Sequence, residues 1–208
     1  MGYSQAQKAE SRQRVLENAS RQIRENGIEA LGVADCMRSA GLTHGAFYGH
    51  FASRDALIVE ALEYALKQSR ARIAARESTA GNPGKGGETP LQSIAEAFLD
   101  ERHVKDPGSG CALCALAGEA RHANADVRAL LTRYLSELTA HVAQAAPSGG
   151  EKSALGIVAT IVGAITLARA VDDDELARSV LASSLALVMT QDSSGSSDSS
   201  DSSDSSGH

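Results

Sequence analysis

Residues 40–51 read Ala40-Gly41-Leu42-Thr43-His44-Gly45-Ala46-Phe47-Tyr48-Gly49-His50-Phe51, and this stretch decides the fold. Gly41 predicts a sharp turn, because glycine adopts positive φ without a Cβ clash. Thr43 stands where it would cap a following helix of about two turns. Phe47 and Phe51 are one helical turn apart, so both are expected to face inward. With a short helix over 33–40 before the turn, the stretch predicts the second half of a helix-turn-helix.

The outward face of this short helix carries small side chains and hydrogen-bonding groups. Small residues let a backbone approach base edges, and hydroxyl and imidazole groups contact phosphates and bases. The face therefore predicts DNA binding. For Tyr48 and His50 an alternative stays open, in which they only close the surface of a small domain. The outward residues are Thr43, His44, Gly45, Ala46, Tyr48 and His50.

Residues 41–51, followed by Ser53, Arg54 and Leu57, resemble the signature of TetR-type transcriptional repressors. The shared pattern is Ala-Gly, a capped short helix, Tyr-x-His-Phe and Ser-Lys/Arg-x-x-Leu. The resemblance implies that His44, Gly45 and Ala46 approach base edges. It also implies that Thr43, Tyr48, His50 and Arg54 contact phosphates. The chain departs from the pattern at Gly32, where relatives usually carry a phosphate-binding threonine, and at Gly49, where they often carry a larger residue.

Composition predicts an all-α protein, because small and aliphatic residues dominate, aromatic residues make up 3% and tryptophan is absent. The formal net charge is −6, yet cations and anions nearly balance over residues 1–55. Clustering of the cations on one face would then have to attract DNA. Three cysteines, an odd number, fit a reducing cytoplasm. We found neither an apolar run of membrane-spanning length nor a leader pattern, so a cytoplasmic location without a membrane is expected.

Helical spacing of apolar residues divides the chain into three expected regions. The first, 5–52, is a three-helix helix-turn-helix DNA-binding domain whose first helix has a possible Ser4–Gln7 capping box and ends at Gly27. The second, 53–190, is a helical ligand-binding and dimerisation domain. The third, 191–208, is a Ser/Asp tail expected to be disordered.

Within the second region, the pattern predicts the following elements. They are a long helix capped by Ser53, a loop over 78–88, a helix restarted at Thr89-Pro90, a break at 106–110, a short helix over 111–122, a helix capped by Asn124 that ends near 147–150, an apolar helix around 155–165, and a last helix after 172–174.

The last two helices are apolar on nearly every side, so each needs two packing partners. Gly156 and Gly163 would permit close approach of a neighbouring helix. We therefore expect a two-fold homodimer through a bundle of these helices, as the TetR resemblance also implies. In such a dimer the two reading helices would enter successive major grooves about 34–36 Å apart and read a palindrome. The alternative is a buried central hairpin of a monomer.

Cys111 and Cys114 form a Cys-x-x-Cys pair at the expected start of a helix, where a thiolate is stabilised. Three interpretations stay open: two small buried residues, an oxidant or electrophile sensor, and a metal site. The metal site is the weakest, since His103, Glu119 and His122 lack regular spacing and no second pair follows.

An enzyme interpretation starts from the same pair. Alkylhydroperoxidase-like helical proteins place a histidine one turn beyond the second cysteine, where this chain has Gly118; the nearest histidine, His122, is two turns on. No other catalytic motif and no cofactor site is indicated, so we expect a non-enzyme.

The predicted function is a transcriptional regulator, most simply a repressor, that a small-molecule or oxidant inducer releases from a palindromic operator. The inducer, of unknown identity, is expected to bind among the helices of residues 90–145. Its binding would move the two DNA-reading helices of the dimer out of register with the DNA grooves. Two other classes were weighed: a thiol-dependent peroxidase-like enzyme and a helical dimer that binds only protein.

Overall fold

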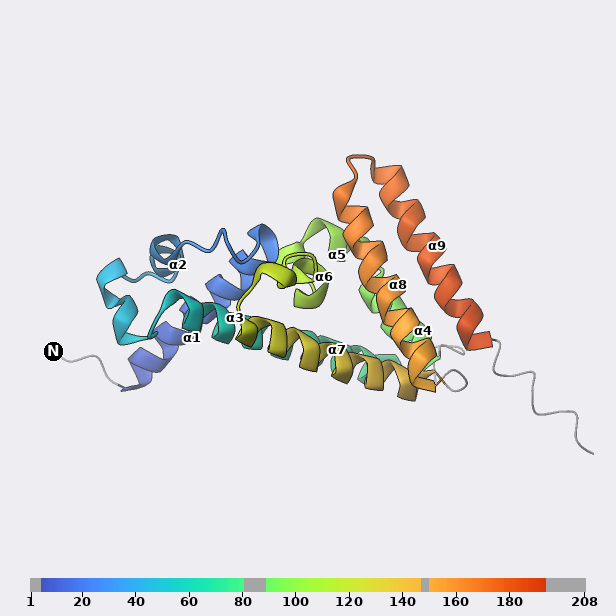
Figure 1. Cartoon of the computed structure of the whole chain (residues 1–208), viewed down its shortest axis with the longest axis horizontal. Coiled ribbons are helices and arrows are strands. Elements are labelled where there is room, and N and C mark those ends of the chain that lie inside the picture. Colours follow the sequence, from blue (N-terminus) through green and yellow to red (C-terminus); the bar gives the residue numbers. More distant parts are fainter. Residues whose placement is uncertain (1–4, 81–88, 147–149, 194–208) are drawn as a thin grey trace, which may run out of the picture. The chain divides into compact units, whose positions relative to one another are not determined.

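The computed structural model describes residues 5–80, 89–146 and 150–193, and over these ranges all regular structure is helical (Figure 1). The expected all-α class is confirmed. Ser4, and with it the predicted capping box, lies outside the described residues. The chain forms two compact units. One comprises the described residues up to 75 together with 101–136, and the other comprises 76–100 with the described residues from 137 onward. The division by role at residues 52 and 53 stays a prediction.

The first unit begins with α1 (Gln5–Asn26) and α2 (Val33–Ser39). The buried side of α1 includes Val15, Ala19 and Ile23, which are fully shielded from solvent. Gly27 ends α1 as predicted: its φ is +86° and its N–H donates to the carbonyl of Ile23 at 3.0 Å. Burying this apolar stripe is what holds the short α2 against α1.

The turn after α2 is built as the sequence predicts. Gly41 has a φ of +75°, and its N–H donates to the carbonyl of Arg38 at 2.9 Å. The next residue, Leu42, donates to Met37 at 2.9 Å, so two of the last carbonyls of α2 are satisfied.

The short helix after the turn differs from the prediction. Residues His44–Gly49 form a 3₁₀ helix, η1, and the Thr43 side chain makes no capping hydrogen bond. Gly45 and Gly49 disfavour a regular α-helix in so short a segment, because fixing glycine costs more conformational entropy than fixing other residues. The inward pair is confirmed: Phe47 and Phe51 are each 3% exposed.

Helix α3 (Arg54–Ala80) follows, and its residues up to 75 belong to the first unit. The predicted cap is confirmed, since the N–H of Ala56 donates to Ser53 Oγ at 3.0 Å. The predicted apolar stripe is buried as well. The helix continues through residues 78–80, where a loop had been predicted, and residues 81–88 lie outside the described ranges. The stripe consists of Leu57, Ile58, Ala61, Leu62, Ala65, Leu66 and Ile73.

Short helices complete the first unit: α5 (Glu101–Lys105), η2 (Pro107–Ser109), α6 (Ala112–Leu116), η3 (Ala120–His122) and the start of α7 (Ala125–Ala145). The prediction of one helix over 111–122 is wrong, because the chain turns at 117–119. Gly118 favours the break, and Glu119 then bonds elsewhere: its Oε2 accepts the N–H of Ile28 at 3.0 Å. The predicted cap of α7 is confirmed, with Val127 N–H donating to Asn124 Oδ1 at 2.9 Å.

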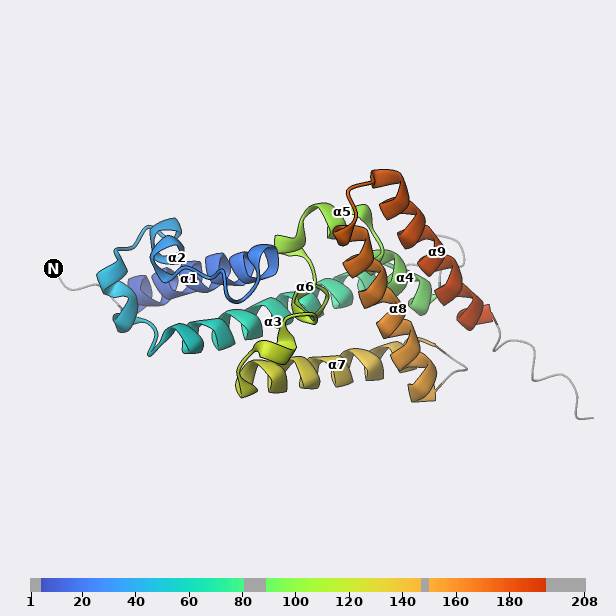
Figure 2. The same cartoon turned by 45° about the horizontal axis from the view of Figure 1, so that its top comes forward.

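The second unit contains α4 (Pro90–Phe98), the end of α7, α8 (Gly150–Ala170) and α9 (Asp174–Ser193). Thr89 caps α4 as predicted, since its Oγ1 accepts the N–H of Gln92 at 3.1 Å. Helices α8 and α9 run side by side as an antiparallel hairpin, and α4 contacts both (Figures 1 and 2). Helix α9 extends past residue 191, the predicted start of the tail, and residues from 194 onward lie outside the described ranges.

One described helix is long and apolar enough to cross a membrane, by length and composition alone. It is the segment Lys152–Ala170 of α8, with a mean hydropathy of 1.7. One side of it, which includes Ala154, Ile157 and Ile165, is buried in the second unit. That is the behaviour of a core helix, and the apolar character that the sequence shows on the other side needs a separate explanation.

Candidate nucleic-acid interface

The outward face of η1 is open. Thr43, His44 and Gly45 are exposed, and the Tyr48 side chain is 77% exposed. An added Cβ at Gly45 or Gly49 would meet no atom within 4 Å, so the backbone itself is accessible. Of the predicted contact residues in η1, Ala46 is half-buried. A backbone without side chains in front of it can approach a groove closely.

Buried aromatic rings hold this face in place. The Phe47 and Phe51 rings stack with centroids 5.8 Å apart, and the Tyr48 ring meets Phe47 edge-on at 5.2 Å. Aromatic pairs of this geometry add about 0.5–1.5 kcal/mol beyond the apolar area that they bury. Tyr48 therefore stands on a packed base with its ring in solvent.

His50 is less available than its neighbours. Its side chain is half-buried, its Nδ1 has no hydrogen-bond partner, and its ring lies 6.3 Å from that of Phe51. Burial, then the charges of Lys8 and Arg12, lower the pKa of His50, which favours the neutral imidazole. This environment favours the packing alternative for His50; a phosphate contact from it stays a prediction.

Arg54 has a role within the protein. Its guanidinium donates to the carbonyls of Ile28 and Glu29, each at 2.9 Å, and of Leu31 at 3.1 Å. These bonds fix the loop between α1 and α2 to the first turn of α3. The predicted phosphate contact of Arg54 is not tested by this arrangement and stays a prediction.

Two arginines of α1 were missed by the sequence analysis. Arg12 donates to the carbonyl of His50 at 3.3 Å, pairs with Glu60 and lies over the Phe51 ring at 4.8 Å. Arg14 donates to the carbonyl of Ala40 at 3.3 Å. Together they tie α1 to both ends of the 40–51 stretch. No local pattern distinguishes these arginines from solvated ones, because their partners are 26 and 38 residues away.

The expected basic face is largely neutralised by neighbouring carboxylates. Ion pairs join Arg12 to Glu60, Arg14 to Glu10, Arg21 to Glu25 and Arg38 to Asp35. The geometry thus offers close backbone approach and exposed hydroxyl and aromatic groups rather than a strong field of positive charge.

The Cys-x-x-Cys pair lies in the same unit, at the start of α6. Cys111 and Cys114 are free thiols that are 1% and 5% exposed. Hydrogen bonding from Cys114, opposed by burial and helped by Tyr134, lowers the pKa of Cys111 to about 6, and Tyr134 Oη lies 3.7 Å from Cys111 Sγ. Cys36 behaves differently, since burial raises its pKa to about 11. The Cys111 thiol is therefore easier to deprotonate than an ordinary thiol, and the Cys36 thiol is harder to deprotonate.

Comparison with known proteins identifies the chain. The family model of the bacterial regulatory proteins of the tetR family matches residues 15–61, which span the geometry just described. Residues 15–61 therefore carry the sequence of a TetR-family DNA-binding region. A DNA-binding transcriptional regulator is the function class that this match and the relatives give.

The relatives are consistent with that assignment. An uncharacterized HTH-type transcriptional regulator of Bacillus subtilis, YerO, is 32% identical over 98 residues, which is 47% of this chain but only 33% of YerO. Another, MT0206 of Mycobacterium tuberculosis, is 29% identical over 171 residues and covers 76% of this chain and 84% of its own length. The chain thus spans a third of one relative and most of the other.

Solved structures share the fold of this chain. The reduced form of NemR from E. coli has a TM-score of 0.70 at 20% identity, with 86% of this chain and 96% of NemR covered. A TetR transcriptional regulator from Chloroflexus aurantiacus has a TM-score of 0.70 at 24% identity, with 89% and 95% covered. At these identities the likeness concerns the fold alone. Nothing in the comparisons supports the peroxidase alternative.

Over the described residues, no cluster of three or more His, Cys, Asp or Glu side chains could hold a metal ion. The sequence-predicted site residues fall into two places in the TetR fold. Thr43, His44, Gly45, Ala46 and Tyr48 gather on the outside of η1, whereas Arg54 lies on the inner side of the α1–α2 loop.

Proposed function

We propose that this TetR-family chain is a cytoplasmic homodimeric repressor that binds a palindromic operator through η1. The observation that carries the proposal is Tyr48, which is 77% exposed on a base of stacked phenylalanines, in a helix where Gly45 and Gly49 have open space beside them. An aromatic hydroxyl raised beside an accessible backbone suits a phosphate contact next to groove entry.

Dimerisation through α8 and α9 is supported by their unburied faces. Four leucines of this hairpin are 48–59% exposed: Leu155, Leu167, Leu176 and Leu187. An added Cβ at Gly156 or Gly163 would meet no atom within 4 Å. A patch of this kind marks an interaction surface, and a two-fold interface covers the same patch on both copies. The monomer alternative of a fully buried hairpin does not account for these leucines.

For release, we propose an oxidant or electrophile acting at Cys111. The supporting geometry is a pair of free thiols, Cys111 at the N-cap of α6 and Cys114 three residues on. With diamide, the sulfurs of Cys111 and Cys114 join in a disulfide, and the azo group takes up the two electrons and two protons. Such a bond would pull on the loop before α6, which packs against α1.

The proposal is tested by a mobility-shift assay with DNA from upstream of the gene. A specific, salt-sensitive complex is expected with that DNA and not with a scrambled duplex. Diamide should dissociate it in the wild type and in Cys36→Ser, but not in Cys114→Ser. Failure of the reduced protein to prefer the upstream DNA would overturn operator binding. If diamide dissociates the DNA complexes of the wild type and of Cys114→Ser equally, the thiol mechanism alone is overturned.

A further inference from the structure

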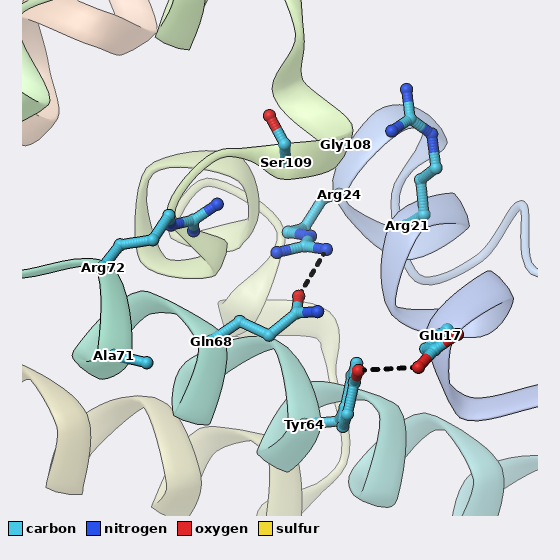
Figure 3. A pocket seen from close by; sticks show the side chains of 9 residues that line it. All are labelled: Glu17, Arg21, Arg24, Tyr64, Gln68, Ala71, Arg72, Gly108 and Ser109. Carbon is cyan, nitrogen blue, oxygen red and sulfur yellow. Dashed lines mark hydrogen bonds between the residues drawn. The ribbon is translucent and has the colours of Figure 1, made fainter. Parts of the chain in front are cut away.

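A cavity of about 490 Å³ lies in the first unit, between the second half of α1, the middle of α3 and the η2 turn (Figure 3). Three arginines line it: Arg21 and Arg24 from α1, and Arg72 from α3. Gln68 and Ser109 add neutral polar groups. We call this space the arginine cavity. Its volume falls within the range of about 300–1,000 Å³ that is usual for small-molecule sites.

Arg24 is a buried cation held by neutral oxygens. Its side chain is 6% exposed, and it donates to the carbonyls of Ser20 at 3.0 Å and Gly110 at 3.2 Å and to Gln68 Oε1 at 3.0 Å. Burying a guanidinium among neutral acceptors is costly, and the charges of Cys111 and Asp106 offset that cost only in part.

Arg72 adds a second positive charge at the same point. It donates to the same carbonyl of Gly110 at 2.9 Å and to Ser69 Oγ at 3.3 Å. Burial first, and then the charge of Arg72, lower the pKa of Arg24 to about 10. Two like charges thus share one acceptor on the wall of a cavity.

The carboxylates near the arginine cavity are already engaged. Glu17 accepts the Tyr64 hydroxyl at 3.1 Å, and Arg21 pairs with Glu25 at 2.8 Å and Asp106 at 3.0 Å. Of the three lining guanidiniums, Arg21 is thus paired with carboxylates, whereas Arg24 and Arg72 donate to carbonyl, amide and hydroxyl oxygens. These two guanidiniums favour an anion, because guanidinium groups bind carboxylate and phosphate oxygens with paired hydrogen bonds.

We propose that the arginine cavity binds a small organic acid whose carboxylate or phosphate oxygens are held by Arg24 and Arg72. The proposal rests on the proposed function, in that the bound acid is an inducer. The arginine cavity is lined mainly by α1 and α3, so it differs from the inducer site that the sequence analysis expected among residues 90–145. Only Gly108 and Ser109 of that range contribute to its lining.

The geometry connects the arginine cavity to the DNA-binding face and to the thiol pair. Arg24 belongs to the helix whose other arginines, Arg12 and Arg14, hold the 40–51 stretch. Its shared acceptor, Gly110, directly precedes Cys111. An anion that draws both guanidiniums from this carbonyl detaches the η2 loop from α1 and α3. The bound state then favours an α1 position that no longer suits the operator.

The first test uses calorimetric titration of the full chain with malonate, citrate and inorganic phosphate at constant ionic strength. At least one anion is expected to bind, and Arg72→Gln is expected to weaken that binding about tenfold or more. The matched control is Arg76→Gln, one turn along α3, where the same charge is removed from an exposed position outside the lining. Arg24→Lys keeps the positive charge but loses the planar guanidinium that forms paired hydrogen bonds, so it should also weaken anion binding.

Absence of binding by all three anions, or an equal effect of Arg72→Gln and Arg76→Gln, would overturn the site. The second measurement separates the site from the proposed function. Operator affinity is measured by fluorescence anisotropy with and without the anion that binds. An anion that binds but leaves operator affinity unchanged would overturn the inducer role. Absence of operator binding by the anion-free protein would overturn the proposed function, while the titration result would still stand.

Discussion

The ring of Phe51 stacks on the ring of Phe47, with centroids 5.8 Å apart, and the Phe47 ring meets the exposed Tyr48 edge-on at 5.2 Å. The stacked pair holds η1 in place where regular α-helical hydrogen bonding does not. The shape of the proposed DNA-reading surface thus depends on two buried rings rather than on helix propensity.

Replacing Phe47 by alanine should therefore destabilise the fold, because it removes the support of η1 and not only one side-chain contact. Removing a buried phenylalanine costs about 3–5 kcal/mol, from lost transfer free energy and from the cavity left behind. Urea unfolding followed by circular dichroism measures the loss. Phe47→Leu, which fills most of the space, should cost clearly less. Equal stability of Phe47→Ala and the wild type would show that the stack does not support η1.

Two glycines with positive φ should respond differently to alanine. At Gly41, with φ +75° and no atom near an added Cβ, the cost is that of the left-handed backbone alone, about 1–2 kcal/mol. At Gly27, with φ +86°, the Cβ would also meet Glu119 Oε1 at 2.5 Å, so the loss in unfolding free energy should be larger. Gly45→Ala, in open space without positive φ, is the control and should change stability by less than either. A smaller loss at Gly27 than at Gly41 would contradict this account of the Glu119 contact.

The thiolate of Cys111 makes stability depend on pH. Its pKa is about 6 in the folded chain against an ordinary value of 9.0, so between these values the unfolded state binds more protons. The free energy of unfolding should therefore rise as the pH goes from 7 to 8.5, by an amount on the order of 1 kcal/mol per pH unit at most. This contribution is lost as the pH falls through about 6.

Denaturant midpoints at pH 7 and 8.5, compared between wild type and Cys111→Ser, measure this slope. The serine variant should lose most of the rise. Cys36→Ser is the matched control, because the raised pKa of Cys36 keeps that thiol protonated throughout the window. Identical slopes in the wild type and Cys111→Ser would show that Cys111 is not a thiolate.

The exposed leucines of α8 and α9 predict the oligomeric state. Leu167→Glu combined with Leu187→Glu places charges on side chains that are 59% and 55% exposed, so the single chain should stay folded. Light scattering coupled to size-exclusion chromatography should then show a dimer for the wild type and a monomer for the double variant. Thr132→Glu, on the exposed side of α7, should remain a dimer. A monomeric wild type would remove the proposed interface.

The sequence predicted those parts of the fold that depend on local rules. Caps at Ser53, Thr89 and Asn124 and the turn at Gly41 need only neighbouring residues, and all four are as expected. The helix over 111–122 was mispredicted because a distant contact, Glu119 to Ile28, competes with its continuation. The arginine cavity could not be predicted from the sequence for a similar reason. Its walls come from α1, α3 and η2, which are far apart in the chain.

The candidate DNA-binding residues show the same limit. Spacing placed Tyr48 outside and Phe47 inside correctly, because one turn of any helix separates those faces. It could not show that Arg54 donates to three carbonyls of the α1–α2 loop, nor that Arg12 reaches the carbonyl of His50. Charged side chains with distant backbone partners leave no periodic signal in a sequence.

The central claim is that the outward face of η1 contacts operator DNA, and Tyr48→Ala tests it most directly. Fluorescence anisotropy with the upstream duplex compares wild type, Tyr48→Ala and the control Thr132→Ala at one salt concentration. Because the Tyr48 ring is 77% exposed, its removal should cost at most the roughly 0.5–1.5 kcal/mol of its edge-on contact with Phe47 and leave the chain folded. We predict that Tyr48→Ala weakens operator binding about tenfold, the loss of one good phosphate contact, while Thr132→Ala binds as the wild type does. Unchanged affinity of a folded Tyr48→Ala variant would contradict the account.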